Sequence, residues 1–397
     1  KETPYLCFME MSLLKDEFVR LYGPGGDEMK IYFAPGRVNL IGEHTDYNNG
    51  YVLPAALSFG TYLLVRPNGT EKIRLATTNF DYRTEIPHAK ISEKHSGQWV
   101  NYPLGVMTEF IALGKSVQGM DMLYSGDIPA AAGLSSSASI ELVTAVALND
   151  IHGYGLSSTD LVHLCVRAER GFVGVQCGIM DQFIVGKGKA GAALFLDCAT
   201  EEYRHVPFNP ENYRLVIADT KKPRKLSDSK YNERVAQCRE GVKAISEVMP
   251  INSLGELEPS ILADLDDIVA DPVVLKRVRH IVTENHRVLE AVNCLQQEDY
   301  VTFGNLMNAS HNSLRDDYEV TGPELDAMVE ASRRQAGVLG SRMTGAGFGG
   351  CTVSLVKRDV VSEFIREVTK DYHRNTGFYP DFYLPEISEG AGRIITD

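Results

Sequence analysis

The segment Ala34–Tyr47 (APGRVNLIGEHTDY) constrains the fold of this chain more than any other. Its apolar residues, above all Val38–Ile41, predict a strand, and the Pro35-Gly36 pair is expected to break that strand. Three ionisable side chains follow within one short turn: Glu43, His44 and Asp46. Carboxylates accept hydrogen bonds from pairs of hydroxyl groups, and an imidazole can donate or accept, so the turn could bind one polyhydroxylated ligand. Any one of these residues alone would instead suggest a surface salt bridge.

The length of the chain predicts two domains. Its 397 residues exceed the size that one hydrophobic core usually supports, which is about 250–300 residues. The polar segment 201–212 holds two prolines, and we place the boundary there, giving domains 1–205 and 206–397. Before the boundary, strands alternate with helices. After it, helical patterns dominate, at 230–248, 275–297, 300–314 and 323–335.

A second segment, Gly126–Ser139 (GDIPAAAGLSSSAS), predicts a phosphate-binding loop. It follows a strand-like stretch and precedes an amphipathic helix from about Ser139 to Asn149. A helix N-terminus presents unpaired N–H groups and a positive dipole end, which suits a triphosphate. The three serines add hydroxyl groups, although they could also merely cap the helix. The loop is not a Walker A sequence, because the Gly-Lys-Ser at 114–116 has Glu109 where that motif needs glycine.

A third segment, Arg167–Gln182, contains two acidic residues of interest. Glu169 lies late in a helix-like stretch, and Asp181 follows a glycine-flanked turn. A divalent cation that bridges phosphates needs one or two oxygen ligands from the protein. Glu169 and the hydroxyl group of Ser137 could supply them, although Glu169 taken alone would be a solvated helix charge.

The glycine-rich string Met343–Cys351 formally contains the dinucleotide fingerprint G-x-G-x-x-G. A strand-like run at 351–356 follows it, where the fingerprint needs a helix. Since 338–344 also reads as a strand, the string predicts a glycine-rich hairpin and not a Rossmann fold.

In this order, the segments resemble the motifs of the GHMP family of small-molecule kinases, and Ala34–Tyr47 is similar to the galactokinase signature within it. Supporting strings lie at 306–311, 314–318 and 323–326. The resemblance implies a two-domain α+β fold: an N-terminal domain like ribosomal protein S5 domain 2 and a ferredoxin-like C-terminal domain. The active site would lie in the cleft between them, with the glycine-rich hairpin closing the phosphate region.

The resemblance also implies an activity: transfer of the ATP γ-phosphoryl group to the C1 hydroxyl of α-D-galactose, the first step of the Leloir pathway. Asp181 would accept the hydroxyl proton and Arg37 would stabilise charge. A nearby Arg37 would weaken Asp181 as a base by lowering its pKa, so Asp181 is expected chiefly to orient the hydroxyl. Mg²⁺ would be bound by Ser137 and Glu169.

The resemblance assigns the remaining site residues to the two substrates. The sugar would be bound by Glu43, His44, Asp46, the backbone of Gly178, and Tyr231. The adenine would lie against Trp99 and Tyr102, although a single tryptophan is often a core residue. The phosphates would be bound by Ala131, Ala132, Gly133, Leu134, Ser135, Ser136 and Ser137.

The composition of the chain limits the classes of partner that it is expected to bind. A net charge of −13 argues against nucleic-acid or anionic-membrane binding, which needs a basic face. No run approaches ~18 apolar residues, and seven cysteines without C-x-x-C spacing suggest reduced thiols in the cytoplasm. The chain begins at Lys1 and not at a methionine, so the sequence leaves open whether a leader segment was removed. The expected partners are galactose and ATP, with no obligate protein partner.

Two alternatives remain at this point. One is a kinase of neighbouring specificity, such as an N-acetylgalactosamine kinase, which needs a pocket enlarged around C2. The other is a catalytically silent sugar sensor that resembles the enzyme. Such sensors lack the dipeptide after the serine run, whereas Ser137-Ala138 is present here and favours the enzyme.

Overall fold

The N-terminal half of the chain is built on a six-stranded sheet. The computed structural model describes residues 3–25, 28–129, 133–222 and 227–395. The sheet has the order β13-β1-β3-β6-β4-β5, and all its neighbours are antiparallel except β4 and β6. The bounds of its strands are β1 Lys30–Asn39, β3 Pro54–Pro67, β4 Lys72–Thr77, β5 Tyr82–Pro87, β6 Met120–Gly126 and β13 Gly392–Ile394.

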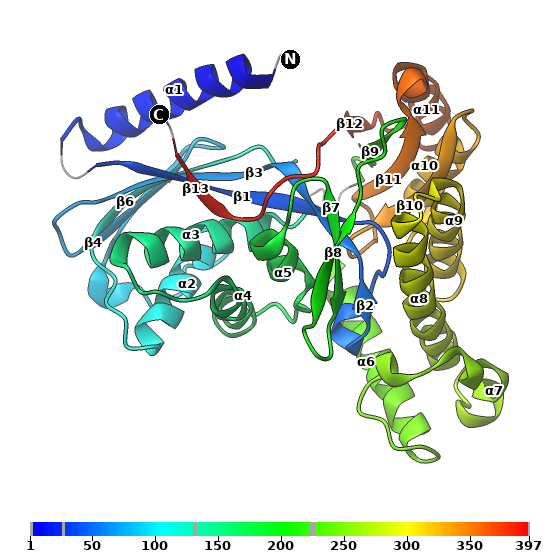
Figure 1. Cartoon of the computed structure of the whole chain (residues 1–397). Coiled ribbons are helices and arrows are strands. Elements are labelled where there is room, and N and C mark those ends of the chain that lie inside the picture. Colours follow the sequence, from blue (N-terminus) through cyan, green and yellow to red (C-terminus); the bar gives the residue numbers. More distant parts are fainter. Residues whose placement is uncertain (1–2, 26–27, 130–132, 223–226, 396–397) are drawn as a thin grey trace.

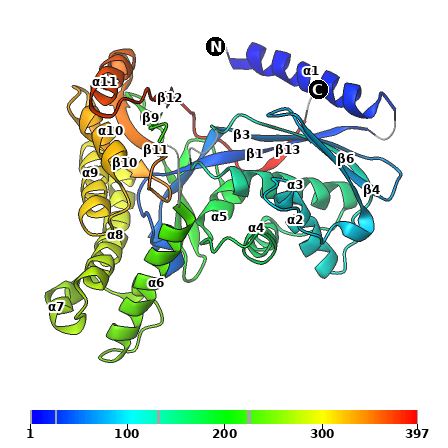
Figure 2. The same cartoon turned by 180° about the vertical axis from the view of Figure 1, so that it is seen from behind.

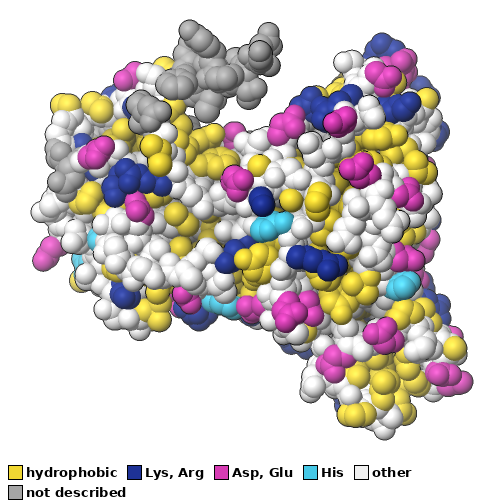
Figure 3. Space-filling view, viewed as in Figure 1, with side chains coloured by type: hydrophobic (Ala, Val, Ile, Leu, Met, Phe, Trp, Pro, Cys, Tyr) yellow, Lys and Arg dark blue, Asp and Glu magenta, His cyan; other side chains and the backbone are white. Residues whose placement is uncertain are grey.

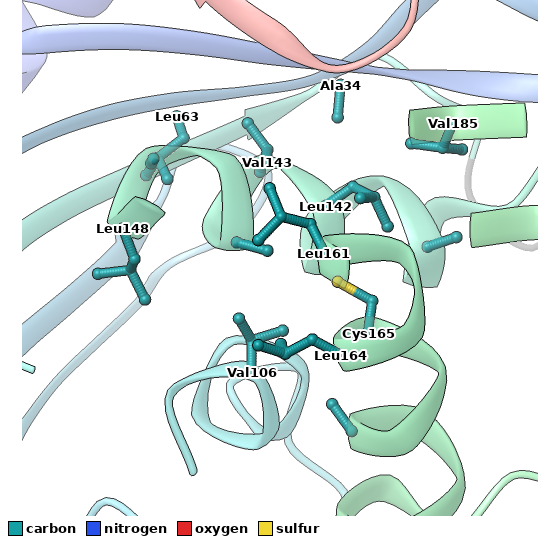
Figure 4. Packing of buried hydrophobic residues seen from close by; sticks show 14 of the residues in the cluster. Ala34, Leu63, Val106, Leu142, Val143, Leu148, Leu161, Leu164, Cys165 and Val185 are labelled. Carbon is teal, nitrogen blue, oxygen red and sulfur yellow. The ribbon is translucent and has the colours of Figure 1, made fainter. Parts of the chain in front are cut away.

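Helices cover both faces of this sheet (Figure 1). The helix α1 (Thr3–Tyr22) lies on one face, and four α-helices with one π-helical turn lie on the other: α2 Asn101–Ala112, α3 Ser136–His152, α4 Ser158–Arg167, the π-helix Ala168–Val173 and α5 Met180–Lys187. The two faces follow from the alternation of side chains along a strand. Leu63 and Val65 of β3 face α2–α5, whereas Leu64 between them packs under α1. Figure 4 shows the tight apolar packing of the larger cluster.

The C-terminal half is a four-stranded antiparallel sheet with helices against it (Figures 1 and 2). Its order is β10-β11-β9-β12, and α9 packs directly on β10. The bounds are β9 Tyr213–Asp219, α6 Ser227–Ser246, α7 Leu265–Ile268, α8 Pro272–Gln296, α9 Tyr300–Asp316, α10 Pro323–Arg333, β10 Val338–Thr344, β11 Cys351–Lys357, α11 Val361–Thr376 and β12 Asp381–Tyr383. The helices predicted after residue 230 and the glycine-rich hairpin are confirmed.

A third, small sheet and short helical turns complete the fold. The small sheet has the order β2-β7-β8, with bounds β2 Tyr51–Val52, β7 Ala192–Asp197 and β8 Tyr203–Pro207. The 3-10 turns are Asp46–Asn48, His88–Lys90, Leu254–Glu256, Pro259–Ala263 and Arg358–Val360. No helix of the described residues is long and apolar enough to span a bilayer.

The two halves of the chain share one apolar cluster, and a strand from the C-terminal end of the chain belongs to the N-terminal sheet. Val38 of β1 and Ile41, which follows this strand, pack in the same cluster as Phe303 and Met307 of α9. At the other end of the chain, β13 pairs with β1 across Ile31–Phe33. The boundary that we predicted between residues 205 and 206 falls inside β8, and the division into domains at that point stays a prediction.

One local expectation was wrong. The Pro35-Gly36 pair does not break the strand: β1 runs on to Asn39, with only a shift in its register against β3 between Pro35 and Arg37. A proline without an N–H group is tolerated at such a bulge. The polar segment 201–212 also contains a strand, β8, whose pairing with β7 supplies the order that its composition did not suggest.

Candidate active site

Arg37 and Asp181 form a two-pronged ion pair at the centre of the candidate site. Arg37 comes from the bulge of β1 and Asp181 from the first turn of α5. Nε and Nη2 of Arg37 each lie 2.8 Å from one carboxylate oxygen of Asp181. The arginine is 5% exposed, but a quarter of the Asp181 side chain (26%) is open to solvent. The structure therefore places the two predicted catalytic residues side by side, with the carboxylate accessible.

The same pair is attached to the phosphate loop. Nη1 of Arg37 donates to the carbonyl oxygen of Gly133 at 2.8 Å, and its backbone N–H donates to that of Leu134 at 3.1 Å. The hydroxyl of Ser135 donates to Oδ2 of Asp181. A carboxylate has about four acceptor positions. Arg37 and Ser135 fill three of those of Asp181, which leaves one, on Oδ1, for a substrate hydroxyl.

The serines of the loop have distinct roles. Ser135 holds the N-cap position of α3 but has a left-handed backbone (φ 62°) and makes no capping hydrogen bond. The simple capping alternative is therefore wrong for this residue, since its hydroxyl contacts Asp181. Ser136 is exposed at the helix N-terminus, and Ser137 hydrogen-bonds to Glu169. Ala131 and Ala132, also predicted for the phosphates, lie outside the described residues.

Glu169 lies in a buried polar cluster with Ser137 and Gln182. It is 5% exposed and comes from the π-helical turn that follows α4. The amide nitrogen of Gln182 donates to Glu169 and lies 3.2 Å from Oε2 of Glu141. Burial, and then the charge of Asp181, raise the pKa of Glu169. Within the described residues no three His, Cys, Asp or Glu side chains are grouped so that they could hold a metal ion.

Glu43, the first of the three predicted sugar-binding residues in the turn after β1, contacts the glycine-rich turn of the C-terminal half. Glu43 is 2% exposed, and its Oε1 accepts from the backbone N–H of Gly345 at 2.7 Å and lies 3.5 Å from Nη1 of Arg342. Gly345 begins the glycine-rich turn between β10 and β11, where an added Cβ would lie 3.0 Å from the carbonyl oxygen of Gly133. The glycine-rich turn therefore closes on the phosphate loop, as expected.

Asp46 faces Gly178 and Asp181. A Cβ atom built on Gly178 would lie 1.7 Å from Oδ2 of Asp46, so only glycine leaves room for this carboxylate. Burial raises the pKa of Asp46 to about 7, and the negative charges of Asp181 and Glu43 act in the same direction. The backbone N–H of Tyr47 and the charge of Arg37 oppose them. The structure thus brings Asp46, Gly178 and Asp181 together, as the predicted sugar site requires.

Gly178→Ala tests this packing. We expect the new methyl group to displace the flexible end of Asp46 without unfolding the protein, because the atoms in its way belong to a side chain. The KM for the sugar should then rise by about tenfold or more, as in a site that loses a matched polar partner. Gly171→Ala is the matched control, since its Cβ would meet open space. Equal sugar KM values for the two variants, measured by steady-state kinetics, would contradict the proposed contact.

His44 lies in an aromatic group with Tyr231 and two further tyrosines. Its ring centroid is 5.8 Å from that of Tyr231, 5.9 Å from that of Tyr47 and 4.8 Å from that of Tyr318. Burial, and then the charge of His280, lower the pKa of His44 to about 3, so the ring is neutral near pH 7. Tyr231, from α6, also lies near Asp46. The predicted sugar residues of the turn and of α6 therefore converge.

Trp99 belongs to an aromatic cluster beside the strand that leads into the phosphate loop. Its ring centroid is 5.3 Å from that of Tyr124 on β6 and 6.4 Å from that of the exposed Phe80. The indole Nε1 is buried without a hydrogen-bond partner. Tyr102 lies one helical turn further on, half-buried at the start of α2. These positions are compatible with both an adenine wall and a core role.

Charge is distributed evenly over the visible surface. In Figure 3 acidic and basic side chains are interspersed, without a large patch of one sign. With a net charge of −13 the protein has no overall positive field, so a negatively charged nucleotide would be bound by local groups, such as the N-terminus of α3 and Arg37.

Sequence reasoning missed three residues that support the site: Arg342, Tyr47 and Tyr318. Arg342 is fully buried on β10 and donates to the carbonyl oxygen of Asn39 at 2.9 Å, which joins the two sheets behind Glu43. A charged residue inside an otherwise strand-like run was a signal that could have been followed. The two tyrosines end the segments 34–47 and 314–318 that the resemblance singled out, but they were given no role, since they are separated by 271 positions and meet only in the folded chain.

Three family models match the chain. The galactokinase galactose-binding signature covers residues 16–67, the N-terminal domain of GHMP kinases covers 101–189 and their C-terminal domain covers 291–374. Among curated relatives, the galactokinase of Clostridium acetobutylicum is 49% identical over 92% of this chain and 94% of its own, and that of Enterococcus faecalis is 44% identical over 96% and 99%.

Solved structures agree with the family models. The structure of Lactococcus lactis galactokinase complexed with galactose has a TM-score of 0.94 and 42% identity, and the match covers 97% of this chain and all of that one. Methanococcus jannaschii mevalonate kinase, at 18% identity and a TM-score of 0.65, shares the fold over 92% of this chain and 99% of its own. The expected two-domain fold is thereby confirmed, and the chain belongs to the galactokinase family of GHMP kinases.

Proposed function

We propose that this protein transfers the γ-phosphoryl group of ATP to the C1 hydroxyl of α-D-galactose, with Arg37 and Asp181 at the reacting oxygen. The galactokinase activity itself follows from membership of the family. The observation that supports this assignment of roles is the ion pair between the two residues. Arg37 binds the phosphate loop, and Asp181 lies close to Asp46.

The geometry favours positioning over strong base catalysis. Transition states of phosphoryl transfer are loose, so catalysis depends mainly on alignment and charge stabilisation. The remaining acceptor position of Asp181 would orient the hydroxyl, and the proton would pass to the carboxylate late in the reaction. Arg37 is already charged and fixed, so it can stabilise the charge that develops between the sugar oxygen and the γ-phosphate.

The sugar site is proposed to consist of Glu43, His44, Asp46, Gly178 and Tyr231. Asp46 is the strongest candidate for pairing with sugar hydroxyls, because its carboxylate lies against Gly178 and close enough to Asp181 for the two charges to interact. The adenine is proposed to lie against Trp99 and Tyr102, supported by the unpartnered indole nitrogen of Trp99. The phosphates are assigned to residues 131–137. A cytoplasmic location and the lack of an obligate protein partner stay predictions.

A sugar panel tests the function. Purified protein should consume ATP rapidly with galactose, and phosphorus NMR should identify the product as galactose 1-phosphate. Glucose, which differs at C4 alone, should be a very poor substrate, because a site built to pair with a hydroxyl discriminates strongly against its misplacement. Comparable kcat/KM values for glucose and galactose would contradict the assignment. A preference for N-acetylgalactosamine would favour the neighbouring kinase, and absent turnover would favour the sensor.

Ser137 and Glu169 are the residues proposed to hold a Mg²⁺ ion together with the nucleotide. The cation would supply charge neutralisation on the phosphates, and it would offset the burial and the Asp181 charge that raise the pKa of Glu169. The chain's own contribution is orientation, because Gln182 and Ser137 both hydrogen-bond to Glu169. Glu169 therefore has a fixed position before any ligand arrives.

The metal assignment predicts a shared effect of two substitutions. Ser137→Ala and Glu169→Ala should each raise the Mg²⁺ concentration needed for half-maximal activity, and the double variant should be less impaired than additivity requires. Ser157→Ala is the control, because Ser157 caps α4 in a capping box and its loss should cost only about 1 kcal/mol of stability. The activity of each of the four variants is measured as a function of the Mg²⁺ concentration. An unchanged Mg²⁺ requirement in both singles would remove the metal role.

A further inference from the structure

A chain of hydrogen bonds runs from His44 into the C-terminal half. Nδ1 of His44 lies 2.9 Å from the hydroxyl of Tyr47, which lies 2.7 Å from the hydroxyl of Tyr318. The hydroxyl of Tyr318 lies 3.1 Å from the sulfur of Cys238 on α6. His44, Tyr318 and Cys238 are each at most 5% exposed. Tyr47, the link between them, is half-buried. The chain therefore connects the sugar turn to α6 and to the segment after α9.

One direction of this chain is chemically better than the other. An imidazole nitrogen is a stronger acceptor than a phenol oxygen, and a thiol sulfur is a weak acceptor. The favourable order is therefore that Cys238 donates to Tyr318, Tyr318 to Tyr47, and Tyr47 to Nδ1 of His44. In the opposite order, a phenol O–H would donate to the weakly accepting sulfur and an imidazole N–H would donate to a phenol oxygen.

The far side of the ring agrees with this direction. If Nδ1 accepts, a neutral His44 must carry its hydrogen on Nε2, which is buried and has no partner in hydrogen-bond geometry. The carbonyl group of Ala346 lies close to the ring, and a carbonyl can only accept. Ala346 therefore offers Nε2–H an acceptor, but outside good hydrogen-bond geometry. A poorly paired N–H group in the interior is costly, so an oxygen of a bound ligand would improve the pairing of Nε2.

We propose that Tyr47, Tyr318 and Cys238 are positioning residues that hold His44 as its Nε2–H tautomer, so that it donates a hydrogen bond to one oxygen of the bound sugar. The inference rests on the proposed function, which places the sugar at this turn. It adds a prediction about sugar specificity. At the sugar oxygen that His44 contacts, the site requires a hydrogen-bond acceptor, whereas carboxylates such as Asp46 require hydrogen-bond donors on the sugar.

Deoxy and deoxyfluoro sugars separate the two requirements. A C–F group can accept a hydrogen bond weakly but cannot donate one, and a C–H group can do neither. We would measure dissociation constants by calorimetry for galactose analogues altered at C2, C3, C4 or C6. The position that His44 contacts is the one whose deoxygenation no longer weakens binding in His44→Ala. There, wild type should bind the fluoro analogue at least about threefold more tightly than the deoxy analogue, the scale of one modest hydrogen bond.

The tyrosine variants then test the positioning. In Tyr47→Phe the preference for fluorine over hydrogen at that position should disappear, because Nδ1 has lost its donor and either tautomer is allowed. Tyr318→Phe should reduce the preference, and it serves as the second variant if Tyr47→Phe does not fold. ATP affinity should be unchanged in both. Tyr372→Phe is the control, since it removes one hydrogen bond, to the carbonyl oxygen of Thr220, from a tyrosine that is as fully buried as Tyr318.

The outcomes distinguish the inference from the function. Wild type that binds the fluoro and deoxy analogues equally, or Tyr47 and Tyr318 variants that keep the wild-type preference, would overturn the inference while galactose phosphorylation stands. Wild type that fails to phosphorylate galactose would overturn the proposed function itself. Loss of the preference in both variants, with Tyr372→Phe unaffected, would establish the positioning role.

Discussion

Asp181→Asn should lower kcat by about two to four orders of magnitude, the range for loss of a positioned acid–base group. The substitution keeps the shape of the side chain but removes its charge and half of its acceptor capacity. Nε and Nη2 of Arg37 both donate to this carboxylate, and an amide nitrogen cannot accept from either of them. The variant therefore loses the orientation of the substrate hydroxyl and that of Arg37 together. ATP binding should stay largely intact.

A matched control separates chemistry from stability. Asp121→Asn also removes a buried carboxylate that pairs with arginines, Arg66 and Arg74, but on the strands of the N-terminal sheet away from Arg37. It should lower the melting temperature at least as much as Asp181→Asn while retaining most of kcat. Stopped assays of turnover and thermal unfolding of both variants provide the comparison. Asp181→Asn that keeps more than roughly a tenth of wild-type turnover would show that Asp181 does not have this role.

The elements that sequence predicted well are those with strong local signals. The helices α8 and α9 begin within three residues of the starts that their helical patterns predicted. The caps Asp271 before Pro272 and Asp299 before Tyr300 fix these starts in the structure. The hairpin β10–β11 was also visible, since four glycines between its strands need positive φ angles. Such signals lie within a few residues of one another and survive without knowledge of the rest of the chain.

The features that could not be predicted depend on contacts between distant residues. Ser135 has the sequence of a helix cap, but its hydroxyl contacts Asp181, 46 positions away, in place of the helix N–H groups. β8 has a polar composition and becomes a strand only because β7 lies beside it. The same holds for Glu43, whose contact with Gly345 spans 302 positions. Resemblance to a family supplied the residues of the site, whereas their pairing needed the structure.

The other large effect is expected at Asp46, where affinity for galactose should depend on one titration. Burial and the charges of Asp181 and Glu43 raise its pKa to about 7, against Arg37 and the backbone N–H of Tyr47. Because the pKa is raised, the carboxylate is protonated below about pH 7 and charged above it. Only the charged form accepts with its full set of lone pairs from sugar hydroxyls. Affinity should therefore be present at pH 8 and be lost as the pH falls through 7.

The size of this effect follows from the titration curve. The charged fraction falls from about nine-tenths at pH 8 to about one-tenth at pH 6, so the Kd for galactose should rise by about tenfold over that range. Asp46→Asn mimics the protonated form and should bind weakly with little dependence on pH. Asp46→Ala should lower kcat/KM for galactose by two orders of magnitude or more, since buried hydroxyl partners are left unpaired.

Calorimetric titration with galactose at pH 6, 7 and 8 gives three Kd values for each protein. Titration with ATP provides the control, because the Kd for ATP should be the same in all three proteins. If wild type bound galactose equally at pH 6 and pH 8, or if Asp46→Asn kept the wild-type dependence, the titration would belong to another group and Asp46 would not be the carboxylate that recognises the sugar.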